Sequence, residues 1–224
     1  MRQTCNENSL FYDAWAKTYD EDINSTIYVD ELHFQKFWGN LENKKVLEIG
    51  CGSGRNTQKL VKSNHHITAI DISQKMLEKA KLKTIKNDIN FICGDFINLE
   101  IEDNDFDFAI ISLVLEHIED LNLFFTKVFS NLKSEASLFI SEIHPQRMQN
   151  GSGARFIDKE KNIEIRAKSF AHKEEDFETA AKAAGFQIVQ KSVFYGTSKL
   201  ANIHIDWSKY NCMPMILVYE FIKP

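Results

Sequence analysis

The sequence lacks the features that mark membrane-spanning and nucleic-acid-binding proteins. Its longest apolar run, from Phe108 to Leu115, is far too short to cross a bilayer. The 27 lysines and arginines are outnumbered by 32 aspartates and glutamates, and no basic cluster is present. The net charge of −5 argues against nucleic acid as the main partner, because phosphate binding needs a basic face. No hydrophobic signal segment follows Met1, so we expect a cytoplasmic protein without membrane insertion.

Cysteine is scarce and widely spaced. Cys5, Cys51, Cys93 and Cys212 form no Cys-x-x-Cys pair, so the spacing of zinc ligands is absent. A chain of 224 residues with so few cysteines does not depend on a disulfide framework. We therefore expect neither a bound metal nor a disulfide scaffold.

Glycine is also rare, but its distribution is informative. The chain has nine glycines, and Gly50, Gly52 and Gly54 lie within five residues, directly after the apolar segment 46–49. Glycine permits sharp turns and close approach of a ligand to the backbone. A buried strand followed by a glycine turn and a helix predicts a nucleotide-type binding site.

The spacing of these glycines separates the candidate ligands. A dinucleotide fingerprint needs its third glycine five residues after the first, whereas here Gly54 comes at plus four and Arg55 occupies plus five. The Gly-Lys-Ser/Thr of a phosphate-binding P-loop is absent. The form Glu-x-Gly-x-Gly-x-Gly, from Glu48 to Gly54, resembles the first motif of class I S-adenosylmethionine-dependent methyltransferases. The alternative is a generic tight turn of an α/β protein.

An acidic residue follows each of the next two predicted strands. Asp71 ends the segment 67–71, 21 residues after Gly50, and an acid at this distance can accept both ribose hydroxyls of an adenosine. Asp95 lies at the end of the segment 89–96. In the family that the chain resembles, this position accepts the adenine amino group and the next side chain packs on the ring. The alternatives are a helix cap for Asp71 and a simple turn for Asp95.

The resemblance implies roles for further residues. Glu48 would support the glycine loop near the methionine amino group, and Arg55 would pair with the methionine carboxylate or remain a solvated surface arginine. The aromatic segment 11–20 would fold over the cofactor as a lid. Cys51 is expected to be a spacer and not a nucleophile. The complete expected cofactor set is Tyr19, Glu48, Gly50, Cys51, Gly52, Arg55, Asp71, Ile72, Met76, Asp95, Phe96, Ser112 and Leu113.

Two histidines follow the predicted fourth and fifth strands. In open α/β sheets ligands bind at the carboxyl ends of the strands, so we expect His117 and His144 to face the methyl acceptor as a base or positioning group. The alternative is a structural hydrogen-bonding role. After Ser112 the chain reads Leu-Val-Leu in place of the N/D-P-P-Y/F run of enzymes that methylate base amines, so a nucleobase is a poor acceptor candidate.

The C-terminal part offers candidates for the acceptor pocket. Arg147 and Arg155 lie in a long polar connection, 146–160, and either bind an acidic acceptor or form a solvated surface pair. Trp207 and Tyr210 are expected to wall the pocket.

The resemblance, within the small-molecule branch that includes menaquinone- and biotin-pathway enzymes, implies a single α/β domain. It predicts a Rossmann-like seven-stranded sheet in the order 3-2-1-4-5-7-6, with strand 7 antiparallel and helices on both faces. We divide the chain into an N-terminal helical lid (1–42), a cofactor-binding core (43–143) and an acceptor-side region (144–224). The expected strands span 46–49, 67–71, 89–96, 105–112 and onward, 136–143, 186–195 and 213–221, with two helices within 9–41 and another at 121–132.

The function implied by the resemblance is methyl transfer from S-adenosylmethionine, leaving S-adenosylhomocysteine, to an oxygen or nitrogen of a small-molecule or carrier-bound acceptor. A carboxylate acceptor is included. The rival hypotheses are a non-catalytic cofactor-binding regulatory protein and, disfavoured by the glycine spacing, a nicotinamide-dependent Rossmann enzyme. The sequence does not identify the acceptor, the pathway, the use of a general base, or whether the protein is a monomer or a homodimer.

Overall fold

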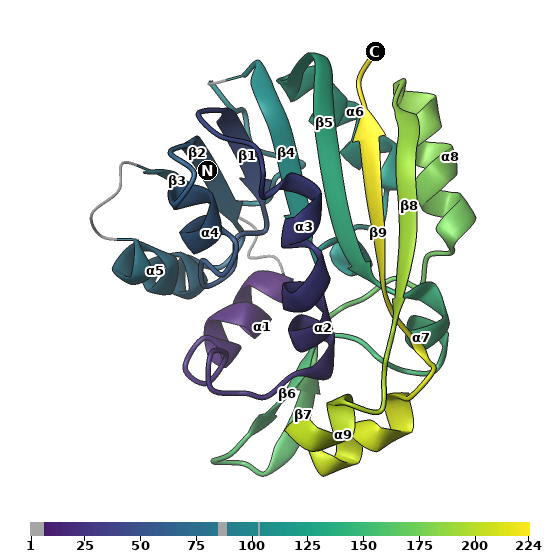
Figure 1. The fold of residues 1–224 in the computed structure, drawn as a ribbon. Helices are drawn as coiled ribbons and strands as arrows, with labels where there is room; N and C mark the ends of the chain where they lie inside the picture. The colour runs from purple at the N-terminus through teal and green to yellow at the C-terminus, as the bar shows by residue number, and fades with distance from the viewer. Residues whose placement is uncertain (1–6, 85–88, 103) are drawn as a thin grey trace.

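A seven-stranded sheet in the order β3-β2-β1-β4-β5-β9-β8 forms the centre of the protein (Figure 1). The structure is a computed structural model and describes residues 7–84, 89–102 and 104–224. The strands are β1 (Lys45–Ile49), β2 (His66–Asp71), β3 (Ile89–Cys93), β4 (Phe106–Ser112), β5 (Leu132–Ile143), β8 (Gln187–Tyr195) and β9 (Pro214–Ile222). β9 runs antiparallel to both of its neighbours, β5 and β8, whereas the other pairings of this sheet are parallel. The predicted strand order and the antiparallel seventh strand are confirmed.

Helices cover both faces of the sheet, because alternate side chains of the strands supply two apolar layers. Leu47 and Ile49 of β1 belong to the layer that is covered by α6 (Leu121–Asn131) and α8 (Glu174–Ala184). Val46 belongs to the opposite layer. This second layer is covered by α2 (Ser25–His33), α3 (Gln35–Trp38), α4 (Thr57–Val61) and α5 (Gln74–Lys83). A parallel strand buried on both faces needs a continuous apolar run, which β1 has from Val46 to Ile49 except at Glu48.

The N-terminal region forms three helices where two were expected. α1 (Glu7–Trp15) ends before Tyr19, so this tyrosine lies in the following turn and not on the helix. The rings of Trp15 and Tyr19 nevertheless remain in edge contact, with centroids 4.8 Å apart. α2 starts where the side chain of Asn24 accepts hydrogen bonds from the backbone of Thr26 and Ile27, a favourable N-cap.

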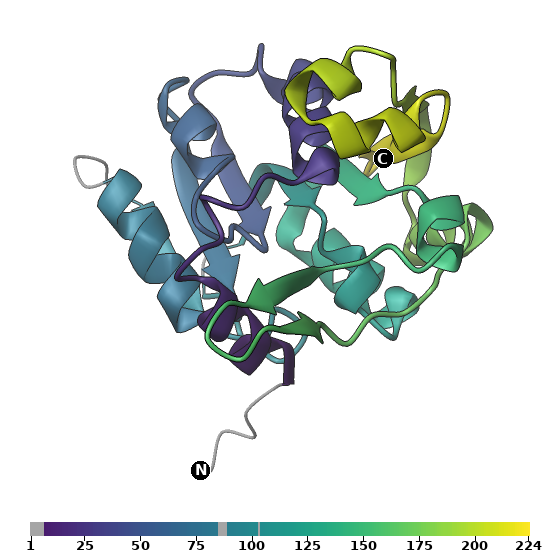
Figure 2. The ribbon, with the colours of Figure 1, turned by 90° about the horizontal axis from the view of Figure 1, so that it is seen from below.

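The connection 146–160, expected to be an irregular polar loop, contains regular structure. It includes most of α7 (Pro145–Gln149) and the strand β6 (Arg155–Asp158), which forms an antiparallel hairpin with β7 (Ile163–Arg166). Phe156 anchors this hairpin by packing against Phe11 and Trp15 of α1. Figures 1 and 2 both show the hairpin beside α1. A single buried aromatic in a polar stretch was too weak a signal for a strand.

The apolar run 108–115 does not continue as one strand. β4 ends at Ser112, and Leu113 adopts a left-handed backbone with φ of 60°. The 3-10 helix η1 (Leu115–His117) then turns the chain. The remaining elements are α9 (Leu200–Ile203) and the 3-10 helix η2 (Ile205–Tyr210). In the part of the chain that the structure describes, no helix has the length and apolar character needed to cross a membrane.

Three cysteines lie within the described residues, and all are free thiols: Cys51 is buried, whereas Cys93 and Cys212 are exposed. Cys5 lies outside the described residues. Across residues 7–84, 89–102 and 104–224, no group of three or more histidine, cysteine or acidic side chains is placed to hold a metal ion.

Candidate active site

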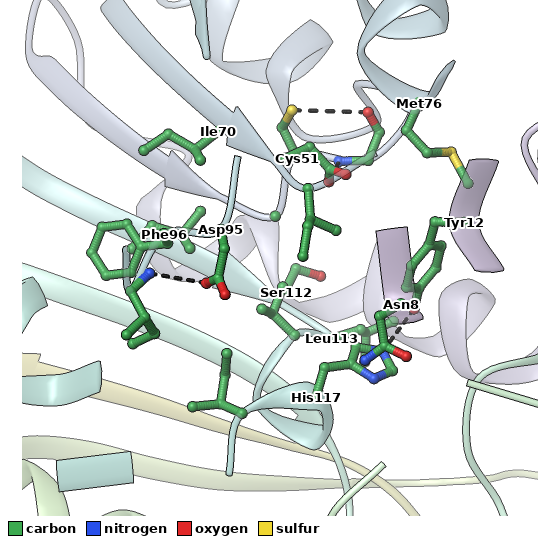
Figure 3. Close-up of a pocket in the computed structure, with 18 of the residues that line it drawn as sticks. Asn8, Tyr12, Cys51, Ile70, Met76, Asp95, Phe96, Ser112, Leu113 and His117 are labelled. Atoms are coloured by element: carbon green, nitrogen blue, oxygen red, sulfur yellow. Dashed lines mark hydrogen bonds between the residues drawn. The ribbon is translucent and has the colours of Figure 1, made fainter. Parts of the chain in front are cut away.

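A cavity of about 390 Å³ lies at the carboxyl ends of β1, β2 and β4 (Figure 3). This volume is within the range of small-molecule sites. α1 contributes Asn8 and Tyr12 to the wall. Of the expected cofactor residues, all but Glu48 line the cavity: Tyr19, Gly50, Cys51, Gly52, Arg55, Asp71, Ile72, Met76, Asp95, Phe96, Ser112 and Leu113.

The glycine turn presents bare backbone to this cavity. The amides of Gly50 and Cys51 both donate to the carbonyl of Ile70, at 2.8 and 3.0 Å, which holds the turn against β2. A Cβ added at Gly52 would meet no atom within 4 Å, so this position leaves an open approach to a ligand. A Cβ at Gly54 would instead lie 2.9 Å from Ala80 of α5. A Cβ at Gly50 would lie 2.2 Å from the Val114 side chain, so packing requires glycine at Gly50 and Gly54, whereas Gly52 is open to the cavity.

Asp71 is held firmly at the end of β2. Its Oδ2 accepts from the Gly52 amide at 2.7 Å and its Oδ1 accepts from the Ser73 amide at 2.9 Å. Ser73 is the N-cap of α5, where its hydroxyl accepts from the Met76 amide. Burial raises the pKa of Asp71 to about 6. Each oxygen of an ionised carboxylate has two acceptor sites, so Asp71 retains capacity for a ligand hydroxyl.

Asp95 both stabilises a turn and lines the cavity. Its Oδ1 accepts from the Ile97 amide at 3.1 Å, and its Oδ2 accepts from the Asn98 side chain at 3.0 Å. The next residue, Phe96, is buried and packs edge-on against Phe124 of α6. Asp95 therefore forms the turn that was the alternative interpretation, and it also lies in the wall of the cavity, as the resemblance implied.

Glu48 lies within β1 and not in the cavity wall. Its carboxyl group accepts a 2.7 Å hydrogen bond from the hydroxyl of Thr57, the first residue of α4. Burial raises the pKa of Glu48 to about 8. The side chain thus braces the helix that follows the glycine turn, and the structure gives it no direct contact with the space that a ligand would occupy.

A buried aspartate that the sequence did not single out binds three residues, from the turn after β1, from β4 and from β5. Asp30 of α2 is fully buried and accepts from Arg55 at 2.5 Å, from Ser112 at 3.0 Å and from Ser141. Arg55 also donates to Ser112 at 2.9 Å. Arg55 is therefore not a solvated surface residue, because Asp30 balances its charge beside the cavity.

His117 lines the cavity and both of its ring nitrogens have partners. Nδ1 lies 2.9 Å from the carbonyl oxygen of Lys168, and Nε2 lies 2.7 Å from the hydroxyl of Tyr12. A carbonyl can only accept, so Nδ1 carries a proton, and in the neutral ring Nε2 accepts from Tyr12. Burial raises the pKa of Tyr12 well above its ordinary value, so Tyr12 is a neutral phenol.

His144, which was expected to face the acceptor, does not lie in the wall of the first cavity. His144 is buried at the start of α7, where its Nδ1 accepts from the Gln146 amide as the N-cap. Its Nε2 lies 3.1 Å from a carboxylate oxygen of Glu174 in α8. It lines neither this cavity nor the second cavity described below. The side chain joins two helices, which is the structural alternative.

A second cavity, of about 720 Å³, adjoins the first and shares Tyr12, Tyr19 and Leu113 with it. Arg147, Arg155, Trp207 and Tyr210 all line this second cavity, as does the buried Glu116. The arginines differ in their surroundings. Arg147 is buried, whereas Arg155 is exposed and pairs with Glu164 at 3.3 Å. They do not form a solvated surface pair.

Contacts between distant segments account for the residues that sequence reasoning missed. Asn8 of α1 donates to the Lys168 carbonyl at 3.0 Å and accepts from the Lys168 amide at 2.9 Å, across a separation of 160 residues. No local pattern indicates this pairing. Tyr12 carried one signal, since a tyrosine beside the apolar face of a helix needs a partner for its hydroxyl.

Comparisons with known proteins agree with this geometry. A family model described as a methyltransferase domain matches residues 47–140, from β1 into β5. A malonyl-[acyl-carrier protein] O-methyltransferase from Priestia megaterium is 34% identical over 143 residues, which are 63% of this chain and 50% of that protein. A ubiquinone biosynthesis O-methyltransferase from Bartonella quintana is 30% identical over 105 residues, 46% of this chain and 42% of that protein. These alignments span about half the length of either relative.

A solved structure supports the fold over the whole chain. The N-methyltransferase NodS from Bradyrhizobium japonicum, in complex with S-adenosyl-L-homocysteine, superposes with a TM-score of 0.71 at 15% identity, covering 98% of this chain and 100% of that chain. The sheet order, the glycine motif at the end of β1 and the family match all agree. Residues 47–140 thus match the methyltransferase-domain family, and the whole chain has the fold of solved S-adenosylmethionine-dependent methyltransferases.

Proposed function

We propose that this protein binds S-adenosylmethionine in the first cavity and transfers its methyl group to an oxygen or nitrogen of a small-molecule or carrier-bound acceptor in the second cavity. The observation that carries the proposal is the junction of the two cavities at Tyr12, Tyr19 and Leu113. A two-substrate transfer needs two binding spaces that meet at the reacting atoms. The first of these spaces carries the family's cofactor motif.

The residues of the first cavity divide between the two ends of the cofactor. Asp71 would accept from the ribose hydroxyls, and Asp95 would accept from the adenine amino group while Phe96 packs on the ring. Ile72 and Met76 would add apolar contacts near the adenine. At the methionine end lie Cys51 and Gly52 of the turn, the backbone of Ser112 and Leu113, and Arg55. The side chains of Tyr12 and Tyr19 would cover this end as part of the lid.

The chemistry asks little of the protein beyond alignment. When bound, the sulfonium supplies an electrophilic methyl group. The chain must place the acceptor atom in line with this methyl and exclude water. α1 contributes to both cavity walls through Tyr12 and is latched to α5, because Asp13 accepts from Ser73 at 2.5 Å and from the Lys75 amide at 3.0 Å.

A base is needed only for an acceptor that carries a proton. Tyr12 lines both cavities and donates to His117, so the pair can pass a proton from an acceptor hydroxyl or amine to the imidazole. A carboxylate acceptor needs no such step. Transfer to oxygen is favoured over nitrogen by the names of two curated relatives, and a carrier-bound acceptor is favoured by the name of the Priestia megaterium protein.

Formation of S-adenosylhomocysteine tests the proposal. The protein would be incubated with S-adenosylmethionine and a panel of phenols, amines, carboxylates and acyl thioesters, and the product quantified by mass spectrometry. At least one acceptor class is expected to raise the yield above the background without acceptor, and Asp71→Ala should reduce this gain when S-adenosylmethionine is below saturation. Cofactor binding without turnover of any class would contradict the proposal and favour the regulatory alternative.

A further inference from the structure

Arg147 is an arginine buried beside the proposed acceptor space. It lies in α7 and retains only 4% of its surface exposed. Its Nη1 donates to the hydroxyl of Thr26 at 2.6 Å, and its guanidinium lies 4.8 Å from the centre of the Tyr210 ring. Its Nε is buried and, among the described residues, has no hydrogen-bond partner. The side chain is thus held in place by neutral groups.

No carboxylate of the described residues lies within ion-pair distance of Arg147. The acidic residues of the same cavity are engaged elsewhere. Glu164 pairs with Arg155 and Arg166. Asp22 accepts from the Trp15 indole and from Thr18. Glu116 accepts from the Ala154 amide and from Ser169, and Asp206 is 74% exposed at its side chain beside His204.

This arrangement is unfavourable for the protein alone. A guanidinium remains charged at any physiological pH, and a charge taken out of water without a counter-ion destabilises the folded state. Burial accordingly lowers the pKa of Arg147; Tyr210 and, more weakly, the carboxylate of Glu116 oppose this effect, whereas Arg155 adds to it. Packing alone would be served better by an apolar side chain of similar volume. The unbalanced charge therefore indicates a ligand that supplies the negative group.

We infer that Arg147 binds a carboxylate of the methyl acceptor in the second cavity. The inference rests on the proposed function for the identity of the ligand as an acceptor, and it adds the chemical class. A carboxylate carries one negative charge and two oxygens in a plane, which matches a single guanidinium fork. A phosphate dianion would leave one charge unbalanced at this site. Arg155 does not offer the same site, because Glu164 already neutralises it.

Pairs of acceptors that differ only in one charged group test this assignment. The probes are 3,4-dihydroxybenzoate against 3,4-dihydroxybenzamide and 4-hydroxybenzoate against 4-hydroxybenzamide, and methylation is scored at the phenol, which both members of each pair carry. With wild-type protein the acid of a pair is expected to exceed the amide about 10- to 100-fold in kcat/KM, the size of a charge-assisted hydrogen-bonded pair. Arg147→Gln should remove this preference. Arg166→Gln, a surface arginine of the hairpin outside both cavities, is the matched control and should keep it.

Binding is measured in parallel, so that the inference remains testable without turnover. Saturation-transfer NMR on protein loaded with S-adenosylhomocysteine should detect the acids with wild type and lose them with Arg147→Gln. Acid binding without any S-adenosylhomocysteine formation would support the carboxylate site while contradicting the proposed transfer. Equal binding of acid and amide to wild type, or acid binding unaffected by Arg147→Gln, would overturn the carboxylate site alone.

Thermal unfolding separates recognition from a structural role. Because the buried charge lacks a counter-ion, Arg147→Gln should melt at or above the wild-type temperature. A clear decrease in melting temperature would mean that Arg147 holds the fold and would count against the inference. Arg147→Lys keeps the charge without the planar fork, and its preference for the acid should lie between those of wild type and Arg147→Gln.

Discussion

The hydroxyl of Tyr12 donates a 2.7 Å hydrogen bond to Nε2 of His117, while Nδ1 of the same ring donates to the Lys168 carbonyl at 2.9 Å. The hydrogen bond to the Lys168 carbonyl keeps the proton of the neutral ring on Nδ1. Nε2 is therefore free to accept the hydrogen bond from Tyr12. Tyr12 lines both cavities, whereas His117 lines only the first. The acceptor would therefore meet the phenol first, and the imidazole would act through it.

This relationship predicts that Tyr12 and His117 act as one unit. Tyr12→Phe and His117→Gln should each lower kcat for a hydroxyl or amine acceptor about 100-fold, the lower range for general-base catalysis. The double variant should lose no more than either single variant. Tyr195→Phe, at an exposed tyrosine of β8, is the control. Losses that multiply in the double variant would show that the two side chains act separately.

Asp71 should make cofactor binding dependent on pH. Burial raises the pKa of Asp71 to about 6, and a protonated carboxyl loses acceptor capacity. The affinity for S-adenosylhomocysteine should therefore fall as the pH is lowered from 7.5 through 6. Asp71→Asn should bind about 1–3 kcal/mol more weakly at pH 7.5 and show little pH dependence. Calorimetry at several pH values measures both, with Glu42→Gln as an exposed control. An unchanged affinity in Asp71→Asn would remove the ribose assignment.

Gly52 and Gly54 of the turn should respond differently to alanine. At Gly54 the new Cβ would lie 2.9 Å from the Ala80 backbone and side chain, so Gly54→Ala should lower the melting temperature by several degrees. At Gly52 the Cβ meets no protein atom, so Gly52→Ala should cost stability only through its φ of 56°, about 1 kcal/mol, and mainly weaken cofactor binding. Differential scanning fluorimetry with and without S-adenosylhomocysteine distinguishes the two. The reverse order of stability loss would contradict the described turn.

Glu48 should make stability depend on pH. Burial raises the pKa of Glu48 from 4.5 to about 8 in the folded protein, so between these values the folded state binds a proton that the unfolded chain has lost. The free energy of unfolding should therefore fall as the pH rises from 4.5 to 8, and change no further from this group above pH 8. Glu48→Gln lacks this titration and serves as the reference. The free energy of unfolding of wild type minus that of Glu48→Gln should decrease between pH 4.5 and pH 8. The expected decrease is a few kcal/mol, since one pKa unit corresponds to about 1.4 kcal/mol. Chemical denaturation at pH 5, 6.5 and 8 measures the difference, and parallel curves for the two proteins would refute the assignment.

Local patterns made much of the fold predictable. The parallel strands are buried on both faces and so appear as apolar runs, and the left-handed turn after β1 demands glycine. The acids at the ends of β2 and β3 follow from the same register, because the carboxyl ends of parallel strands meet at one edge of the sheet. These features depend on residues close in sequence, and Gly50, Gly52, Asp71 and Asp95 all line the first cavity.

Features set by contacts between distant residues were not predictable. Arg147 donates to Thr26 across 121 residues, and Ser141 donates to Asp30 across 111. The burial of these groups depends on how α2 and α7 pack against the sheet. The hydrophobic periodicity of a single segment does not reveal such packing. His144 shows the same limit, since its partner Glu174 lies on a helix 30 positions further along the chain. The position of a residue after a strand predicts that it lies near the site. It does not predict whether the side chain points into the site or away from it.

Calorimetric titration of the purified protein with S-adenosylmethionine and S-adenosylhomocysteine, with NADH as the comparison, tests the central claim most directly. The account predicts binding of both methionine-derived ligands with micromolar affinity, as is usual for a preformed small-molecule pocket, and no binding of NADH. Binding of NADH in place of the other two would contradict the assignment of the first cavity and favour a nicotinamide-dependent enzyme.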